Sequence, residues 1–204
     1  AKGLFTIVDG AHVPGHIPLD LSELKADVYT GACHKWMCTP KGCSFLYVKK
    51  EFQDLFDPLV VSWGYESVAP SHSRFLDYHQ TQGTRDFSAF LTIPRAIQFM
   101  KENNWQKVAA DSRELVHSNY ARFCKLFGTQ PICPITDEFL GQMCSVPVQT
   151  TEPEKLQRLL FEKYKIEVPV MRQDHLTFLR YSINGCNSQA DLDKLYDALT
   201  EITA

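Results

Sequence analysis

Short apolar runs separated by polar turns open the chain, a pattern typical of buried β-strands. The first run, residues 5–8, shows no alternation of apolar and polar positions, which predicts a strand of a parallel sheet covered on both faces. Residues 26–30 and 44–48 predict two more strands, the later one preceded by the turn residues 40–42. A strand covered on both faces needs neighbours, so we expect the sequence to begin in mid-domain, with earlier strands missing.

Helical periodicity dominates the middle and the end of the chain. The strongest pattern is residues 105–127, whose apolar side chains fall broadly on one side. Residues 88–103 also have helical spacing, with Pro94 suited to a first turn and Thr84 or Asp86 as possible caps. The remaining predicted elements are helical turns at 21–24 and 51–56, strands at 142–149, 166–170 and 177–183, a capping box at 151–154 before a helix at 155–164, a closing helix at 188–202, and a long loop at 63–84.

These elements predict an α/β protein with two parts. Residues 1–104 carry the predicted parallel strands, and residues 105–204 form a smaller α+β unit. We therefore expect the domain boundary near Asn104.

The composition of the chain limits the binding partners and the cellular compartment to be expected. The 204 residues carry a net charge of −3, and no Lys or Arg run forms a patch, so neither a nucleic acid nor a membrane surface is an expected partner. No apolar stretch is long enough to span a bilayer, and the first residues lack a secretion-signal layout. Seven irregularly spaced Cys predict no disulfide framework and no standard zinc site, which favours a reducing, cytoplasmic setting.

Polar side chains follow the first two predicted strands. Asp9 comes directly after residues 5–8, and Lys35 follows residues 26–30. Ligands of open α/β sheets bind outside the carboxyl ends of the strands, where a partly desolvated Lys becomes a nucleophile. Taken alone, Asp9 is better explained as an acid that caps a loop, and a lone Lys such as Lys35 is usually an ordinary surface cation.

The segments around these two residues resemble a known family. The sequence DGAH at residues 9–12, followed by CHKWMCTPKG at 33–42, is similar to the fold-type I, class V aminotransferases, a group that includes cysteine desulfurases. Residues 34–42 most resemble its isopenicillin N epimerase-like branch, and the likeness runs over nearly the whole chain. The resemblance implies pyridoxal 5′-phosphate (PLP) as cofactor. It also implies the aspartate aminotransferase-like fold, here the C-terminal half of a large, mostly parallel-sheet domain plus a small α+β C-terminal domain.

The family pattern assigns roles to individual residues. Lys35 matches the Schiff-base lysine, which also serves as a proton-transfer base once substrate frees it. Asp9 matches the acid that keeps the pyridine nitrogen protonated. His12 matches the contact to the ring hydroxyl, and His34 a residue beside the phosphate, although a solvated loop histidine is a common alternative for His34.

One position departs from the family pattern. Ala32 stands where relatives often have a Ser or Asn phosphate ligand. Phosphate binding would then rest on other donors, such as backbone amides, Thr30 or residues of the missing part.

Two later motifs also resemble the family. Gly83 and Thr84 match a segment that reaches the cofactor phosphate of the neighbouring subunit, which implies a homodimer with composite active sites; a helix-entry turn is the plain alternative. Arg180 matches the residue that holds the substrate α-carboxylate, because its planar fork fits a carboxylate. The alternatives are that Arg180 lies on an exposed strand face, or that Arg172 has this role.

The resemblance implies a PLP enzyme that acts at the α-carbon of an amino-acid substrate, with epimerase or C–S lyase chemistry favoured. A class V aminotransferase is one alternative, and a non-catalytic interaction module is another. Cys186 is the nearest candidate for a persulfide carrier, and Asn187 is predicted to cap a helix. Three aromatic residues could line the mouth of the substrate site or could equally be packed in the core: Trp36, Trp63 and Tyr65.

Overall fold

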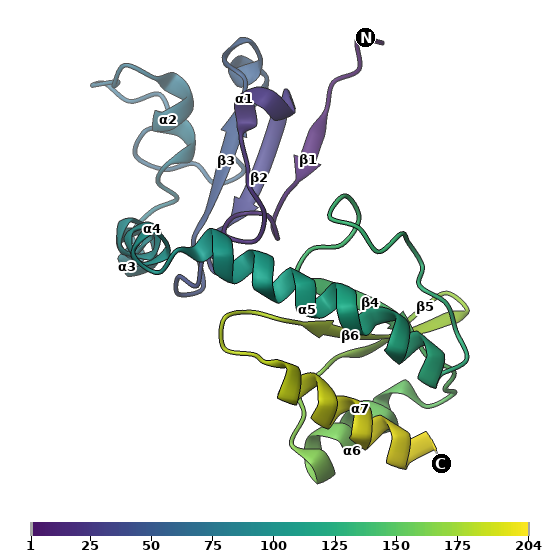
Figure 1. Cartoon of the computed structure of the whole chain (residues 1–204). Coiled ribbons are helices and arrows are strands. Elements are labelled where there is room, and N and C mark those ends of the chain that lie inside the picture. Colours follow the sequence, from purple (N-terminus) through teal and green to yellow (C-terminus); the bar gives the residue numbers. More distant parts are fainter. Residues whose placement is uncertain (1, 204) are drawn as a thin grey trace. The chain divides into compact units, whose positions relative to one another are not determined.

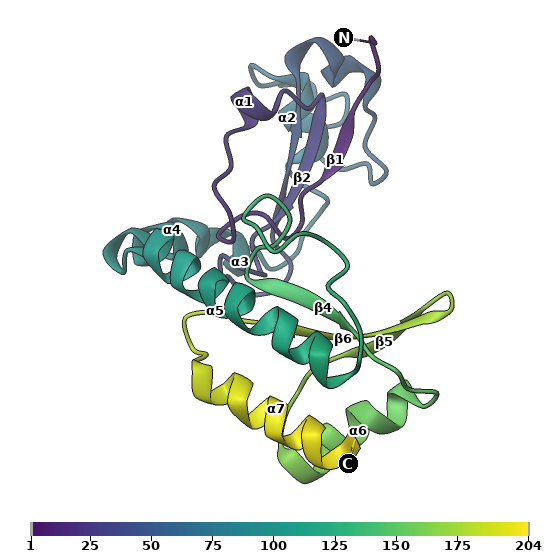
Figure 2. The same cartoon turned by 45° about the vertical axis from the view of Figure 1, so that its right-hand side comes forward.

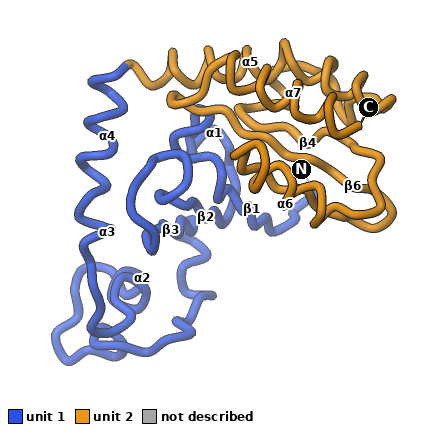
Figure 3. The backbone as a smooth tube through the Cα atoms, turned by 90° about the horizontal axis from the view of Figure 1, so that it is seen from below, with its two compact units in different colours: residues 1–103 blue, residues 104–204 orange. Residues whose placement is uncertain are grey.

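The computed structural model describes residues 2–203, and the chain divides into two compact units, residues 1–103 and 104–204 (Figure 3). Each unit has its own three-stranded sheet (Figure 1). Among residues 2–203, no helix combines the length and the apolar character that crossing a membrane requires.

The sheet of the first unit has the order β1-β2-β3, with β1 at Ile7–Asp9, β2 at Val28–Ala32 and β3 at Ser44–Val48. β1 and β2 are parallel, whereas β3 runs antiparallel to β2. The predicted bounds of β3 are confirmed. β1 and β2 both lie about two residues later than predicted, because their ladder begins at the pair Ile7 and Val28.

Burial separates the two parallel strands. Four of the five residues of β2 are buried. The burial predicted for the first strand is wrong, because Ile7 of β1 is 66% exposed. The reason is position: β1 is an edge strand of the described sheet, so only β2 has neighbours on both sides.

A buried carboxylate joins the three strands at the end of the sheet where β2 begins. Asp27 accepts hydrogen bonds from the backbone N–H and hydroxyl of Thr6, at 2.8 and 2.9 Å, just before β1. Its other oxygen accepts a 2.6 Å charge-assisted hydrogen bond from Lys49, just after β3. These contacts, the bond from Lys49 foremost, lower the pKa of Asp27 below its usual value. One side chain thus holds both outer strands against β2.

The first unit also contains short helices. They are α1 at Leu21–Leu24, a 3₁₀ helix at Lys50–Leu55, α2 at Arg74–His79, α3 at Ser88–Leu91 and α4 at Ile93–Glu102. The carboxylate of Asp20 caps α1, whose predicted bounds are confirmed. α2 lies inside the predicted long loop, where the Ser73 hydroxyl caps it by accepting from Leu76 N–H.

The single helix predicted at 88–103 is in fact two. The break falls at Thr92, whose hydroxyl bonds back to the Ala89 carbonyl at 2.7 Å, and Pro94 lies in the first turn of α4. Of the two predicted caps, Asp86 is the one that accepts from the Ser88 N–H at the start of α3, although the N-cap position itself is Phe87.

The second unit packs three helices on an antiparallel sheet (Figures 1 and 2). Its sheet has the order β4-β6-β5, and its elements are α5 at Trp105–Leu126, β4 at Met143–Pro147, α6 at Pro153–Tyr164, β5 at Val170–Gln173, β6 at Leu176–Ser182 and α7 at Gln189–Thr203. Alternate residues of β4 and β6, including Val146, Leu179 and Tyr181, enter one core with side chains of all three helices.

Two local predictions in this unit are wrong. The strand expected at 166–170 lies at β5 instead, because pairing with β6 starts only at Val170. The predicted capping box does not form: Glu152 precedes α6 without a side-chain cap, and Thr150 rather than Thr151 bonds the Glu152 N–H.

We expect Asp27→Asn to lower the melting temperature at pH 7, because it removes the charge that Lys49 and Thr6 contact. Since the folded-state pKa of Asp27 is lowered, its contribution is fully present above the ordinary carboxyl pKa of about 3.9 and is lost as the pH falls from there through the lowered pKa of the folded state. Thermal unfolding from pH 7 to pH 3 checks this, and the two proteins should converge at acid pH. Asp57→Asn, at an exposed surface carboxylate, is the control and should change little.

Candidate functional site

The topology brings the ends of the first two strands to one edge of the sheet. Because β1 and β2 are parallel, both carboxyl ends lie at the same edge. Asp9 is the last residue of β1 and pairs with Thr30, while β2 ends at Ala32, three residues before Lys35. The predicted neighbourhood of Asp9 and the Lys35 loop therefore follows from strand direction.

Asp9 has one oxygen engaged and one open. Its Oδ1 accepts a hydrogen bond from the Ala11 N–H at 3.0 Å, so the loop-capping role is real. No other described residue donates to this exposed carboxylate. The charge of Asp9 also adds to burial in raising the pKa of Tyr29 above its usual value. A carboxylate held in this way can accept a further hydrogen bond.

Lys35 lies in a tight loop, residues 33–43, between β2 and β3. The Lys35 carbonyl accepts from the Cys38 N–H at 3.2 Å, and the Cys33 carbonyl from the Thr39 N–H at 3.3 Å. The side chain of Lys35 is exposed and forms no ion pair with any residue in 2–203. The backbone is thus fixed while the amine remains available.

The loop of residues 10–17, which follows β1, packs directly on the Lys35 loop. The His16 ring stacks on the Trp36 ring, with centroids 4.2 Å apart and an interplanar angle of 17°. Gly15, at φ +81°, lies so close that a Cβ there would meet the Trp36 backbone at 2.7 Å. Contact between the two loops sets the position of Asp9 relative to Lys35.

Two predicted histidines lie within these loops. His12 is half-buried, and its carbonyl accepts a 3.1 Å hydrogen bond from Nδ1 of His16. His34 is also half-buried, and its Nδ1 donates to the Cys43 carbonyl at 3.3 Å. His34 is therefore part of the loop scaffold rather than a freely solvated side chain.

His16 is a residue of this region that sequence reasoning missed. It stacks on Trp36 and bonds the loop of His12, and so links both chain segments. The signal available in the sequence was weak: a second histidine four residues after His12 and a Gly between them. Trp36 itself, 8% exposed, is held by this stack.

Gly83 and Thr84 lie on the segment between α2 and α3. Gly83 has φ +99° with open space around it, and Thr84 is exposed. Neither residue lies at a helix N-terminus, because α3 starts only at Ser88 and has four residues. The residues on either side of this pair, Gln82 and Arg85, are the ones that line a pocket.

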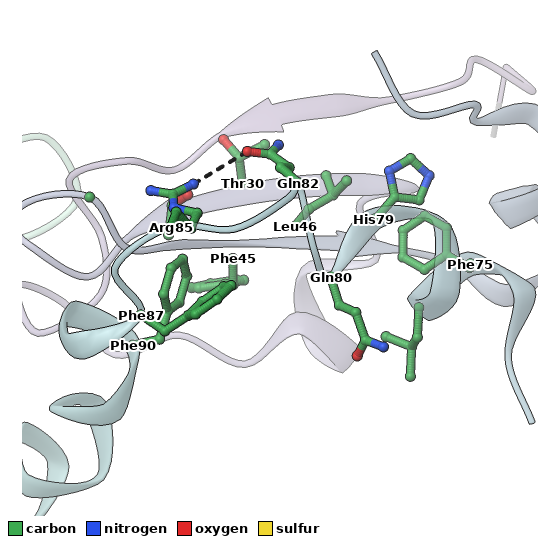
Figure 4. Close-up of a pocket in the computed structure, with 13 residues that line it drawn as sticks. Thr30, Phe45, Leu46, Phe75, His79, Gln80, Gln82, Arg85, Phe87 and Phe90 are labelled. Carbon is green, nitrogen blue, oxygen red and sulfur yellow. Dashed lines mark hydrogen bonds between the residues drawn. The ribbon is translucent and has the colours of Figure 1, made fainter. Parts of the chain in front are cut away.

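That pocket, of about 550 Å³, lies within the first unit between strands β2 and β3 and the segment from α2 to α3 (Figure 4). Thr30 and Leu46 line it from the sheet, and the Arg85 guanidinium donates to Gln82 at 3.4 Å across its rim. Asp9, His12 and Lys35 do not line it. The hollow therefore adjoins the strand edge through Thr30 and is distinct from the Lys35 loop.

Arg180 belongs to the second unit, on β6. It is half-buried, on the face opposite the buried neighbours Leu179 and Tyr181. Its Nε is buried and has no hydrogen-bond partner among the described residues. The side chain lines a small pocket of about 300 Å³ together with Asp191 and Lys194. An unsatisfied guanidinium N–H in a pocket is suited to an anionic ligand. Arg172, the alternative, is exposed and donates to the Thr151 carbonyl.

Several other residues have ordinary structural roles. Cys186 is exposed and its thiol contacts Asn187. Asn187 accepts from the Asn184 N–H instead of capping α7, and at the start of that helix the Asp191 carboxylate accepts from both the N–H and the hydroxyl of Ser188. Tyr65 packs on Tyr78, and Trp63 is 84% exposed. Within residues 2–203, no three His, Cys, Asp or Glu side chains are grouped to hold a metal ion.

Comparisons with known proteins cover almost the whole chain. The family model described as aminotransferase class-V matches residues 1–195. Isopenicillin N epimerase from Streptomyces clavuligerus is 34% identical over a match covering 100% of this chain and 54% of that protein. A probable chloroplastic L-cysteine desulfhydrase from Arabidopsis thaliana is 32% identical, covering 94% of this chain and 43% of that protein.

A solved structure supports the fold. The apo cysteine desulfurase from Thermococcus onnurineus NA1 has a TM-score of 0.79 at 19% identity, over 98% of this chain and 53% of that one. At this identity the likeness shows the fold alone, an α/β PLP-transferase fold. The chain spans about half the length of the curated relatives it matches.

The loop contact yields a stability prediction. Gly83→Ala should lower the free energy of unfolding by about 1–2 kcal/mol, since an L side chain is unfavourable at positive φ. Gly15→Ala should cost more, because the added Cβ also collides with the Trp36 backbone. Urea unfolding of the two variants compares a crowded glycine with an open one of similar φ. If both variants lose the same free energy of unfolding, Gly15 is needed only for its backbone angle.

Proposed function

Because the chain belongs to the aminotransferase class-V family, whose cofactor is PLP, we propose that it is part of an enzyme acting at the α-carbon of an amino acid. Epimerase or C–S lyase chemistry is the proposed reaction type. The observation that carries the proposal is the shared sheet edge. Asp9, which has an open carboxylate oxygen, ends β1, and Lys35, which forms no ion pair with any described residue, lies three residues after the end of the parallel strand β2.

The residues at this edge fit the cofactor. A PLP site needs an amine that is free to bond covalently and an acid that faces a protonated ring nitrogen. Lys35 has no carboxylate partner among the described residues, and Asp9 keeps one oxygen without a donor. Both lie on segments fixed by backbone hydrogen bonds and by the His16–Trp36 stack. This pairing of a fixed backbone with uncommitted side chains supports a covalent cofactor site.

The chain's own residues then have distinct tasks. Lys35 would hold the cofactor and, once freed, take or deliver a proton at the substrate α-carbon through its Nζ. Asp9 would present a fixed negative charge to the ring nitrogen of the cofactor and so keep that nitrogen protonated. When bound, PLP withdraws electrons from the α-carbon, which makes that proton removable. His12 would contact the ring hydroxyl, and His34 would stand beside the phosphate.

A homodimer completes the proposal. Gly83 and Thr84 offer an uncrowded backbone and an exposed hydroxyl on a surface segment. We assign them to the cofactor phosphate of a neighbouring subunit, which would make the active sites composite. Ala32 supports this assignment, since its methyl group cannot serve as a phosphate ligand.

Relatives favour two reaction outcomes. The curated matches include isopenicillin N epimerase and L-cysteine desulfhydrase, each above 30% identity. Both names describe chemistry at or next to an amino-acid α-carbon, so a common proton-transfer step by Lys35 accounts for either. A cytoplasmic setting is also proposed, supported by seven free thiols.

The test of the site is covalent trapping in the intact protein that carries these residues. After incubation with PLP and reduction with borohydride, we expect a phosphopyridoxyl group on Lys35, found by peptide mass spectrometry. Lys35→Ala should lose the adduct and the activity. Lys41→Ala, an exposed lysine of the same loop, should keep both. Labels scattered over surface lysines would contradict the proposal.

The same preparation separates the reaction types. Amino acids labelled with deuterium at Cα, with and without a sulfur leaving group, are followed for loss of label, inversion and sulfide release. Inversion without release identifies an epimerase, and release identifies a C–S lyase. Accumulation of the pyridoxamine form with an amino donor would instead show an aminotransferase.

Arg180→Gln tests the proposed substrate carboxylate contact. Loss of a charge-assisted hydrogen bond costs about 1.5–3 kcal/mol, or about 10- to 150-fold in kcat/KM. We expect this loss to fall mainly on KM, while borohydride trapping at Lys35 stays unchanged. Arg172→Gln is the matched control. A larger effect at Arg172 than at Arg180 would transfer the role to Arg172.

A further inference from the structure

Two buried thiols lie opposite each other at the base of the Lys35 loop. The β2–β3 ladder ends with Ala32 facing Ser44, so the next pair outward is Cys33 and Cys43. The Cys33 N–H donates to the Cys43 carbonyl at 3.2 Å, which continues the strand pairing by one step. Residues 33–43, with Lys35 among them, therefore form a loop whose two ends are cysteines.

The pair has the spacing that a disulfide needs. Residues directly opposite in an antiparallel pair have Cα atoms about 4.5–5.5 Å apart. Disulfides span Cα distances of about 4.4–6.8 Å. Both thiols also belong to one buried cluster with Ala89. The Cα separation expected for such a facing pair therefore lies within the range that a disulfide spans.

The two sulfur atoms already interact. Burial raises the pKa of the Cys33 thiol, and a hydrogen bond with Cys43 adds to the effect. The Thr39 hydroxyl lies 2.9 Å from the Cys43 sulfur, and either atom can be the donor in this contact. Cys38, in contrast, is exposed and donates to the Trp36 carbonyl. The loop thus holds a facing dithiol and a separate surface thiol.

We propose that Cys33 and Cys43 are a reversible redox pair whose disulfide closes the loop that carries Lys35. The oxidant is a hydroperoxide. One of the two sulfurs, as a thiolate, attacks one peroxide oxygen, the O–O bond breaks, and the departing hydroxide takes up the proton lost by the thiol and leaves as water. The sulfur of the other cysteine then attacks the sulfenic sulfur, and a second water leaves with the remaining proton. Two thiols lose two electrons and hydrogen peroxide gains them; an excess of small thiol reverses the change.

The Cys33–Cys43 disulfide would affect Lys35 by restraining the backbone of the loop. Lys35 lies two residues from Cys33, and its own carbonyl already receives the Cys38 N–H. A covalent bond across the base limits opening of the segment between the cysteines. Capture of a cofactor by the Lys35 amine should therefore slow in the oxidised protein.

The experiment uses the intact reduced protein, treated with hydrogen peroxide and then alkylated under denaturing conditions. Peptide mapping without reduction should show Cys33 joined to Cys43, and dithiothreitol should restore both thiols. Cys33→Ser and Cys43→Ser should each abolish the linked peptide, whereas Cys38→Ser should keep it. Alkylation of both Cys33 and Cys43 after peroxide, or a bond from either to Cys38, would overturn the pairing even if a serine variant failed to fold.

A second readout tests the closure. PLP capture, followed by its visible absorbance, should be severalfold slower in the oxidised protein, and equally so in Cys38→Ser. Equal rates in the reduced and oxidised forms would refute the effect on Lys35. A protein that captures no PLP in either state would refute the proposed function, while the mapped disulfide would stand independently.

Discussion

The carboxylate of Asp27 is the contact on which the first unit depends. It receives hydrogen bonds from Thr6 and Lys49, and so fixes the strands on either side of β2. Side-chain direction alternates along a strand, so a slip of one residue between β1 and β2 would turn Asp9 to the opposite face. The strand register that places Asp9 at the candidate site is therefore set by Asp27 at the other end of the sheet.

The two units differ in how their apolar surface is distributed. The second unit has a continuous core of helix and sheet residues, including Phe123, Leu160 and Leu199, each at most 1% exposed. The first unit has a small cluster, and several of its apolar residues, such as Ile7 and Trp63, are largely exposed. Packing stabilises the second unit, whereas polar and loop contacts have a larger share in the first.

Elements with a strong local signal could be predicted from the sequence. The long helix α5 follows from periodicity, and β3 and α1 follow from turn and capping residues. Exposure of β1 and the start of β5 could not be predicted, because both depend on which strand pairs with which.

The same division holds for the candidate site. Asp9 and Lys35 could be found because each follows an apolar run within a motif of recognisable residues. The His16–Trp36 stack could not, since it forms only when two loops meet in space. The Cys33–Cys43 pairing was hidden in the same way, because cysteines ten positions apart become neighbours only through the β2–β3 register.

The stack of His16 on Trp36, with Gly15 beneath it, also has a consequence for engineering the protein. The loops 10–17 and 33–43 are separated in sequence but share one contact surface. A chimera that takes one loop from a relative and keeps the other would combine mismatched partners. The two loops should therefore be exchanged together. A graft that transfers both preserves the spacing between the ends of β1 and β2.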